Sequence, residues 1–296
     1  MSGVSTKIGW KLGTDGNWGR EIGDGVRTPD NLPGQITPPS ARLNLSYGPA
    51  LHKAQLMRIP RCLQLSAPSG HVHKFWRCHN KEYYLALDRI KALYLQCMKE
   101  TLAKGLFKDH IKVTAYCAMD NHFHQILQYL QCFTWLSAFM RQAHSQFGRI
   151  YNILNERSGK VAEGRPKTPL IQDNEHLAWV QFYVEANPIR AKKIPVEKMK
   201  EYKYSSYRYY AYGIEDEFTE MLTPPDWYMA LGNTKKLRQK KYRKLFMKYL
   251  REKGIEPHGF MATFIGSPLW VEQQTRRVKE LVLNGKNGSS ESSDSS

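Results

Sequence analysis

The sequence predicts an α+β domain with a central antiparallel sheet, followed by a basic helical extension. Segment 71–77 has the residues of a first strand, 111–117 alternates as a second, and 122–129 follows after an Asp-Asn turn, as in a hairpin. Two longer segments, 81–104 and 135–159, carry apolar residues at helical spacing. A sheet covered by amphipathic helices is the arrangement that these patterns favour together.

Composition divides the 296 residues into four parts. Residues 1–52 are rich in Gly, Pro, Ser, Thr, Asn and Asp without periodicity, so we expect a flexible tail. A domain over 53–213 and a helical basic extension over 214–284 follow. The last segment, 285–296, is a Ser/Gly/Asn tail that we expect to be disordered. Because 41% of the residues are hydrophobic, the chain can bury a sizeable core.

Net charge is the strongest compositional signal. The 44 Lys and Arg residues exceed the 27 Asp and Glu residues, which gives a net charge of +17 and an isoelectric point near 9.6. A polyanion is the partner that such a charge favours. The sequence has neither a long apolar run nor a signal-peptide core, so we expect a cytoplasmic, nucleoid-associated protein with no membrane partner. Its five cysteines form no CxxC pair, which argues against a disulfide or zinc framework.

The helical segments have recognisable ends. Gly105 stands where the helix over 81–104 should stop. The helix over 135–159 has apolar residues at strict intervals of four: Trp135, Phe139, Ala143 and Phe147. A third helix should begin at Asp173-Asn174-Glu175 and end at Asn187-Pro188, because the residue before proline avoids the helical region. Basic residues dominate 235–253, where Tyr242, Phe246 and Tyr249 are interleaved with them.

Two short stretches carry the chemistry of the chain. His122 and His124 flank one apolar residue, and the period of two in a strand points both imidazoles to the same face. Tyr183 and Asn187 lie four residues apart, so a helix presents them at neighbouring points on one face. Two imidazoles and an amide oxygen can hold a divalent cation with open positions, and a tyrosine beside it is a candidate nucleophile for a phosphodiester.

Each of these residues also has an ordinary structural interpretation. Two histidines at this spacing can simply be satisfied surface residues, and His71-Val72-His73 repeats the spacing in the first strand, where we interpret it as structural or DNA-contacting. Tyr183 is one of 17 tyrosines and could belong to the core. Asn187 before a proline could be a helix stop whose amide caps the helix.

Four motifs in order resemble a known family over roughly residues 55–213. They look like the bacterial single-tyrosine HUH transposases, and most like the subgroup associated with repetitive extragenic palindromes (REP-associated tyrosine transposases). The motifs are Ala118-Met119-Asp120-Asn121-His122-Phe123-His124, Phe139-Met140-Arg141-Gln142 running into Phe147 and Tyr151-Asn152, Tyr183-Val184-Glu185-Ala186-Asn187-Pro188-Ile189-Arg190-Ala191, and Tyr204-Ser205-Ser206-Tyr207.

The resemblance implies a ferredoxin-like sandwich and a site. It implies that His122, His124 and Asn187 hold Mg²⁺ or Mn²⁺ and that Tyr183 is the nucleophile of a 5′-phosphotyrosine intermediate. The substrate would be single-stranded or hairpin DNA of repetitive palindromic elements, and the protein would be a monomer or a homodimer. The chain departs from the family at Asp120, where proline is common, and in a Gly-x-Leu-Trp-x-x-Arg-Tyr segment that is reduced within 159–166.

Basic and aromatic residues near the motifs are candidates for gripping DNA. They are Arg141, Arg149, Arg190, Lys192, Lys193, Tyr204, Tyr207 and Arg208. Three functions compete at this stage: an active HUH nuclease or strand transferase, a domesticated DNA-binding relative without cleavage, and an RNA-binding or unrelated ferredoxin-like module. Formation of a metal-dependent covalent DNA adduct separates the first from the other two.

Overall fold

A computed structural model describes residues 59–253 and 262–287, which all belong to one compact unit of the chain. The predicted tail over 1–52 lies outside the described residues. Of the predicted tail over 285–296, only the first three residues lie within them, at the end of helix α10 (Pro268–Asn287).

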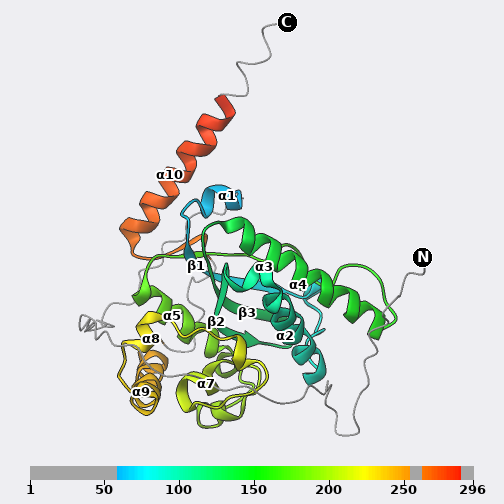
Figure 1. The fold of residues 1–296 in the computed structure, drawn as a ribbon, viewed down its shortest axis with the longest axis vertical. Coiled ribbons are helices and arrows are strands. Elements are labelled where there is room, and N and C mark those ends of the chain that lie inside the picture. Colours follow the sequence, from blue (N-terminus) through cyan, green and yellow to red (C-terminus); the bar gives the residue numbers. More distant parts are fainter. Residues whose placement is uncertain (1–58, 254–261, 288–296) are drawn as a thin grey trace, which may run out of the picture. The chain divides into compact units, whose positions relative to one another are not determined.

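A five-stranded sheet with the order β2-β3-β1-β4-β5 forms the centre of the fold (Figure 1). The strands are β1 (Gly70–Arg77), β2 (Ile111–Ala118), β3 (His122–Tyr129), β4 (Leu170–Ile171) and β5 (Phe264–Ile265). The first three match the predicted strands, and β2 and β3 form the predicted hairpin. The prediction of a purely antiparallel sheet was wrong, because β4 pairs with β5 in parallel. Strands of two residues show no alternation, so the sequence pattern could not reveal them.

Helices cover both faces of the sheet. Phe123 points toward α2 (Asp88–Ala103), where its ring lies 4.6 Å from that of Tyr94. His124, its neighbour on β3, points the other way, and its ring lies 5.6 Å from that of Tyr183 in α5 (Asn174–Glu185). Helix α4 (Phe133–Leu154) packs beside α2 on the first face (Figure 1). The mixed α+β class is therefore confirmed, with the candidate nucleophile on the second face.

Two helices are shorter than predicted, for a local reason. Asn80 and Lys81 adopt positive φ values of 52° and 61° in the 3₁₀ turn η1 (His79–Lys81), which excludes a helix there, so α2 begins only at Asp88. At the end of α4, Glu156 has a φ of 48°, and the helix stops at Leu154 before reaching Gly159.

Helix α5 leads into the second half of the candidate site. Its N-cap is Asp173, whose carboxylate accepts a hydrogen bond from the backbone N–H of His176 at 3.0 Å. The helix was predicted to end at Asn187, but that residue instead opens α6 (Asn187–Arg190). Proline fits the first turn of a helix because a backbone N–H there has no intrahelical acceptor, so no hydrogen bond is lost. The prediction that the segment before proline leaves the helical region was therefore wrong here.

Helices α7, α8 and α9 share a core with α5. Helix α9 (Lys235–Lys253) packs on α7 (Tyr207–Tyr212) and on α5, together with α8 (Asp226–Met229) (Figure 1). The aromatic side chains that interrupt its basic sequence, Tyr242, Phe246 and Tyr249, are buried. None of the helices in the described ranges combines the length and the apolar composition that a bilayer crossing requires.

A buried carboxylate fastens these helices together. Glu185, at the end of α5, is 0% exposed. One of its oxygens accepts a hydrogen bond from the Ser206 hydroxyl and the other accepts one from the Tyr242 hydroxyl, both at 2.6 Å. The remaining short elements are α1 (Arg61–Gln64), α3 (Gly105–Lys108), η2 (Val196–Glu201) and η3 (Thr219–Met221).

Candidate active site

One pocket of about 510 Å³ brings together the four residues predicted for catalysis and metal binding. His122 and His124 reach it from β3, Tyr183 from α5 and Asn187 from α6. The segment 163–167 closes another side. The lining is basic, since four cations take part: Arg77, Arg165, Lys167 and Arg190.

Both histidines are held by their Nδ1 atoms. Nδ1 of His122 lies 2.7 Å from Oδ1 of Asn121, and because that oxygen can only accept, the imidazole donates to it and keeps its lone pair on Nε2. Nδ1 of His124 lies 2.9 Å from Nε2 of His73. The rings of His122 and His124 are 5.0 Å apart and perpendicular. The Nε2 atoms are thus the ones left for a ligand.

The surroundings keep both imidazoles neutral at neutral pH. Burial, followed by the charges of Arg77 and Arg190, lowers the pKa of His122 to about 4. Burial, followed by the neighbouring His122, also lowers the pKa of His124 well below its ordinary value. A neutral imidazole is the form that binds a metal ion, so no proton has to be displaced at either histidine.

Asn187 combines the two interpretations that its sequence position left open. Its amide nitrogen donates to the backbone oxygens of Tyr183 at 3.0 Å and Val184 at 3.1 Å, which caps α5. Both capping bonds use the amide nitrogen, so the amide oxygen of Asn187, which lines the pocket together with His122, takes no part in them. Capping therefore leaves the carboxamide oxygen for another contact.

The donor set fits a hard or borderline divalent cation with open positions. Among the described residues, no group of three or more His, Cys, Asp or Glu side chains could hold a metal ion. A cation at this place would therefore depend on the carboxamide oxygen of Asn187 as the third protein ligand. Two imidazoles and one neutral oxygen suit Mn²⁺, and Mg²⁺ would retain several waters.

Tyr183 stands against the histidines in the same pocket. Its ring is perpendicular to those of His73 and His124, with centroids 5.6 Å from each. The guanidinium of Arg190 covers the ring at 4.5 Å. The side chain is only 3% exposed, so these neighbours fix its orientation. The phenol is therefore adjacent to the candidate ligand His124, although about sixty residues separate them in sequence.

The linker before β4 supplies part of the basic lining. Phe75 and Lys167 exchange two backbone hydrogen bonds, at 3.0 and 2.9 Å, and Glu163 donates its N–H to the oxygen of Arg77 at 2.9 Å. These bonds hold the linker along β1 and bring Arg165 and Lys167 to the pocket. Arg77 was missed by the sequence reasoning because its place depends on the register in which it pairs with His122.

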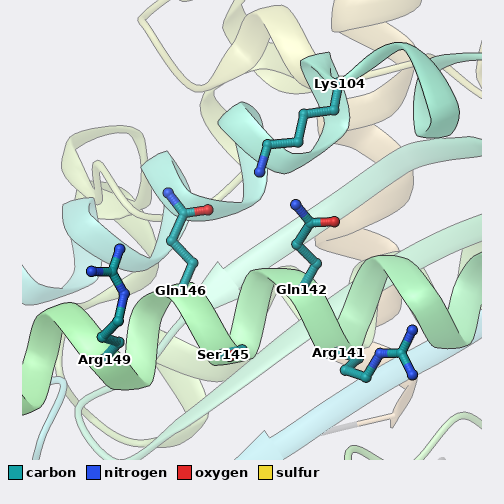
Figure 2. A pocket seen from close by; sticks show the side chains of 6 residues that line it. All are labelled: Lys104, Arg141, Gln142, Ser145, Gln146 and Arg149. Atoms are coloured by element: carbon teal, nitrogen blue, oxygen red, sulfur yellow. The ribbon is translucent and has the colours of Figure 1, made fainter. Parts of the chain in front are cut away.

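Arg141 and Arg149, which were expected to grip DNA, lie away from this pocket. Both are on α4, on the face of the sheet that α2 covers. They line a second hollow of about 530 Å³ together with Lys104, and Figure 2 shows its lining side chains. The rest of its lining consists of Gln142, Ser145 and Gln146. The sheet separates these two arginines from Tyr183.

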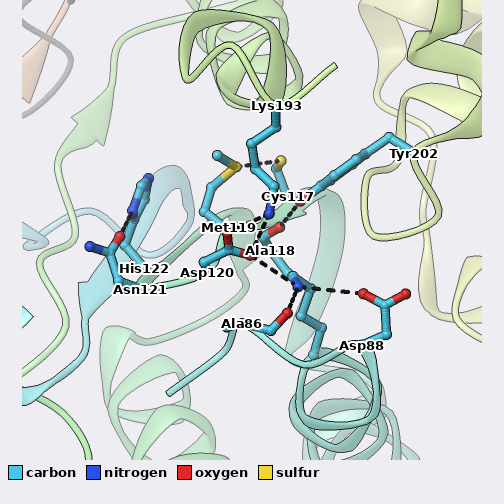
Figure 3. Close-up of polar contacts among 11 residues, drawn as sticks. Ala86, Asp88, Cys117, Ala118, Met119, Asp120, Asn121, His122, Lys193 and Tyr202 are labelled. Carbon is cyan, nitrogen blue, oxygen red and sulfur yellow. Dashed lines mark hydrogen bonds and ion pairs between the residues drawn. The ribbon is translucent and has the colours of Figure 1, made fainter. Parts of the chain in front are cut away.

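The turn before His122 is held by ion pairs (Figure 3). The carboxylate of Asp120 binds the ammonium of the buried Lys91 at 3.1 Å and also that of Lys193. Burial alone would raise the pKa of Asp120, but the hydrogen bonds from Lys193 and Lys91 outweigh it and keep the pKa below its ordinary value. Lys193, another expected DNA contact, is therefore bound to the protein itself. Through Lys91, Asp120 ties the turn to α2.

The other expected DNA contacts are dispersed. Tyr207 is 4% exposed and its ring lies 4.5 Å from that of Phe246, so it is a core residue that offers no surface to a nucleic acid. Arg208 is 3.7 Å from the carboxylate of Asp216. Tyr204 lies beneath Lys91, and Lys192 is exposed beyond α6. Of the eight residues expected to bind DNA, Arg190 lines the pocket and the other seven do not.

Comparison with known proteins gives a likeness to solved structures. No family profile matches the chain, and no curated protein is similar to it in sequence. A solved structure of a REP-associated tyrosine transposase bound to a REP hairpin is similar, with 15% sequence identity and a TM-score of 0.40. The match covers 50% of this chain and 82% of that chain. At this identity and TM-score the likeness assigns no function, so the chemistry has to follow from the pocket residues themselves.

Proposed function

We propose that this protein is a metal-dependent transposase that cleaves and rejoins single-stranded DNA at hairpin or palindromic elements, through a 5′-phosphotyrosine link. The observation that supports this most is the contact between the ring of Tyr183 and that of His124, in a basic pocket that His122 and Asn187 also line. A phenol, two neutral imidazoles and a carboxamide beside several cations suit phosphoryl transfer.

The residues of the pocket would have different roles in the reaction. Arg77, Arg165 and Lys167 would bind the backbone phosphates of one strand. The phenolic oxygen of Tyr183 attacks the scissile phosphorus in line, the bond from phosphorus to the 3′ oxygen breaks, and that oxygen leaves as a 3′-hydroxyl. His122, His124 and Asn187 would hold Mg²⁺ or Mn²⁺, and the ion would supply polarisation of the phosphate and stabilisation of charge on the leaving oxygen.

The link preserves the energy of the phosphodiester. The phenol loses its proton on attack and the 3′ oxygen gains one on leaving, so the step is balanced without a co-reactant. A second 3′-hydroxyl can then attack the phosphotyrosine and restore the phenol, which rejoins strands without ATP. Arg190, stacked on the ring of Tyr183, would keep the phenol in place through both steps.

A second candidate is a DNA-binding relative that has lost cleavage. The observation that favours it is the burial of Tyr183, which leaves only 3% of the residue exposed in a pocket that is basic enough to hold DNA without reacting. Such a protein would bind hairpins in the absence of a divalent cation and would form no covalent product.

Metal removal tests the proposed function. A pool of hairpin oligonucleotides with randomised flanks and a 3′ label should yield a labelled protein adduct on denaturing gels in Mn²⁺ or Mg²⁺. EDTA should reduce the adduct at least about 100-fold, and an excess of Mn²⁺ should restore it. An equal adduct yield in EDTA would contradict the metal dependence. No adduct in either cation, with hairpin binding intact, would favour the second candidate.

The pocket cations should matter more for DNA binding than those on α4. The double variant Arg165→Gln/Lys167→Gln should weaken hairpin binding about tenfold and reduce the slope of log affinity against log salt by about 2, because each phosphate contact contributes about 1. The double variant Arg141→Gln/Arg149→Gln removes the same charge from the other side of the sheet. It should leave the slope nearly unchanged in the same titration. Equal effects would show that DNA also contacts α4.

A further inference from the structure

His73 is a buried histidine in contact with both halves of the site. It lies on β1, is 0% exposed, and pairs with Ile126 of β3. Its ring stacks on that of His124, with centroids 5.1 Å apart and planes at 16°, and its Nε2 lies 2.9 Å from Nδ1 of His124. Its ring also meets the ring of Tyr183 edge-on at 5.6 Å.

The hydrogen bond between the two imidazoles has only two possible directions. If Nδ1 of His124 donates, Nε2 of His124 retains its lone pair and can bind a cation. If Nε2 of His73 donates instead, the proton of neutral His124 must be on its Nε2, and that atom can no longer be a ligand. The direction of this one bond therefore decides whether His124 can serve as proposed.

We propose that His73 is a positioning residue that accepts the Nδ1–H of His124 and so holds Nε2 of His124 ready for a divalent cation. This inference rests on the proposed function, since it assigns His124 as a ligand. Burial strengthens the constraint, because water does not compete for the bond. The backbone N–H of His73 donates to the oxygen of Pro169 at 2.9 Å, which secures the strand at this point.

The same ring supports the phenol. The rings of His73 and His124 are stacked, and the ring of Tyr183 is nearly perpendicular to both, with centroids 5.6 Å from each. A substitution of His73 would therefore affect the cation site through His124, and it would affect the ring of Tyr183 by direct contact. Hydrogen-bond partners of this kind typically change metal affinity 10- to 100-fold when they are removed.

The chain contains a matched control two residues earlier. His71 lies on the same strand with the same parity, but it pairs with Gln128 and lies farther along β1 from Phe75, the partner of His124. His73→Leu removes the acceptor, His73→Gln can restore one through its carbonyl oxygen, and His71→Leu repeats the substitution where no effect on His124 is expected. Melting temperatures of all variants separate folding from positioning.

Two measurements test the inference. Ring-nitrogen NMR of the metal-free, ¹⁵N-histidine-labelled wild type should show His124 protonated on Nδ1, which needs no variant to fold. Mn²⁺ titration followed by electron paramagnetic resonance should show 10- to 100-fold weaker binding for His73→Leu. His73→Gln should stay within about threefold of wild type, and His71→Leu should be unchanged.

The outcomes separate this inference from the proposed function. A wild-type spectrum with the proton on Nε2 of His124 overturns the inference. So does tight Mn²⁺ binding by a folded His73→Leu protein, which leaves the proposed function standing. Wild-type protein that binds no Mn²⁺ and forms no DNA adduct overturns the proposed function, even if the NMR spectrum shows the expected proton position.

Discussion

Tyr183→Phe protein is expected to bind hairpin DNA as wild type does and to form no covalent adduct. Phenylalanine keeps the ring that packs edge-on against His73 and His124 and beneath the guanidinium of Arg190. It removes only the hydroxyl, which is the atom that attacks phosphorus in the proposed reaction. Because no other group replaces that oxygen, the adduct should fall at least about 10³-fold.

A gel-shift titration and a denaturing gel with the 3′-labelled hairpin measure binding and adduct on the same samples. Tyr83→Phe is a suitable control, since it removes a hydroxyl from an exposed tyrosine outside the pocket. Its adduct yield should equal that of wild type. If Tyr183→Phe formed as much adduct as wild type, Tyr183 would not be the nucleophile, however well the pocket is formed.

Glu185→Leu is expected to destabilise the fold by roughly 3 kcal/mol at pH 5. At pH 5 the buried carboxyl group is protonated, and its oxygens accept hydrogen bonds from Ser206 and Tyr242. Its loss removes both acceptors, at about 1–3 kcal/mol each, although Ser206 can still donate to the backbone oxygen of Tyr116 at 3.3 Å. The packing between α5, α7 and α9 depends on these bonds. Urea unfolding, followed by tryptophan fluorescence, measures the change in the free energy of unfolding.

The size of this loss should depend on pH, in a direction set by the carboxyl group. Burial raises the pKa of Glu185 from 4.5 to about 7, against the lowering effect of the hydrogen bonds from Ser206 and Tyr242. Between these values the folded state binds more protons than the unfolded state, so wild type loses stability as pH rises, by on the order of 3 kcal/mol in total. Leucine does not titrate, so the difference between the two proteins should shrink from pH 5 to pH 8.

Glu185→Gln is the matched control, because it keeps one acceptor and cannot ionise. It should lie between wild type and Glu185→Leu at pH 5 and should lack the loss of stability at this site between pH 4.5 and 7. A Glu185→Leu protein as stable as wild type at pH 5, or a difference that grows toward pH 8, would contradict the role given to this carboxyl group.

Local patterns predicted the parts of the site that local chemistry determines. The β2–β3 hairpin and the common face of His122 and His124 follow from alternation and an Asp-Asn turn, and the start of α5 follows from the capping carboxylate of Asp173. The proximity of Tyr183 to these histidines depends on packing between distant segments, and only the resemblance of motifs indicated it.

Features that depend on register or long-range burial were not predictable from the sequence. His73 reaches His124 because β1 and β3 pair in one particular register, and a shift by one residue would turn it to the other face. The role of Glu185 needs two hydroxyls that are 21 and 57 residues away. Tyr207 was expected to contact DNA, but its ring packs on Phe246 of the C-terminal extension. No local sequence pattern predicts that the extension packs on this part of the domain.

The edge of the sheet has a consequence for how the protein is made. Strand β4 leads directly into α5, and β5 is its outer neighbour in the sheet. The backbone N–H groups of Leu170 and Gln172 donate hydrogen bonds to the backbone oxygens of Thr263 and Ile265, respectively. During synthesis, β5 is made almost a hundred residues after β4. Contacts so distant in sequence form slowly, because a long loop must close first. The helix that carries Tyr183 therefore gains this support only after β5 has been synthesised, later than the strand that carries His122 and His124.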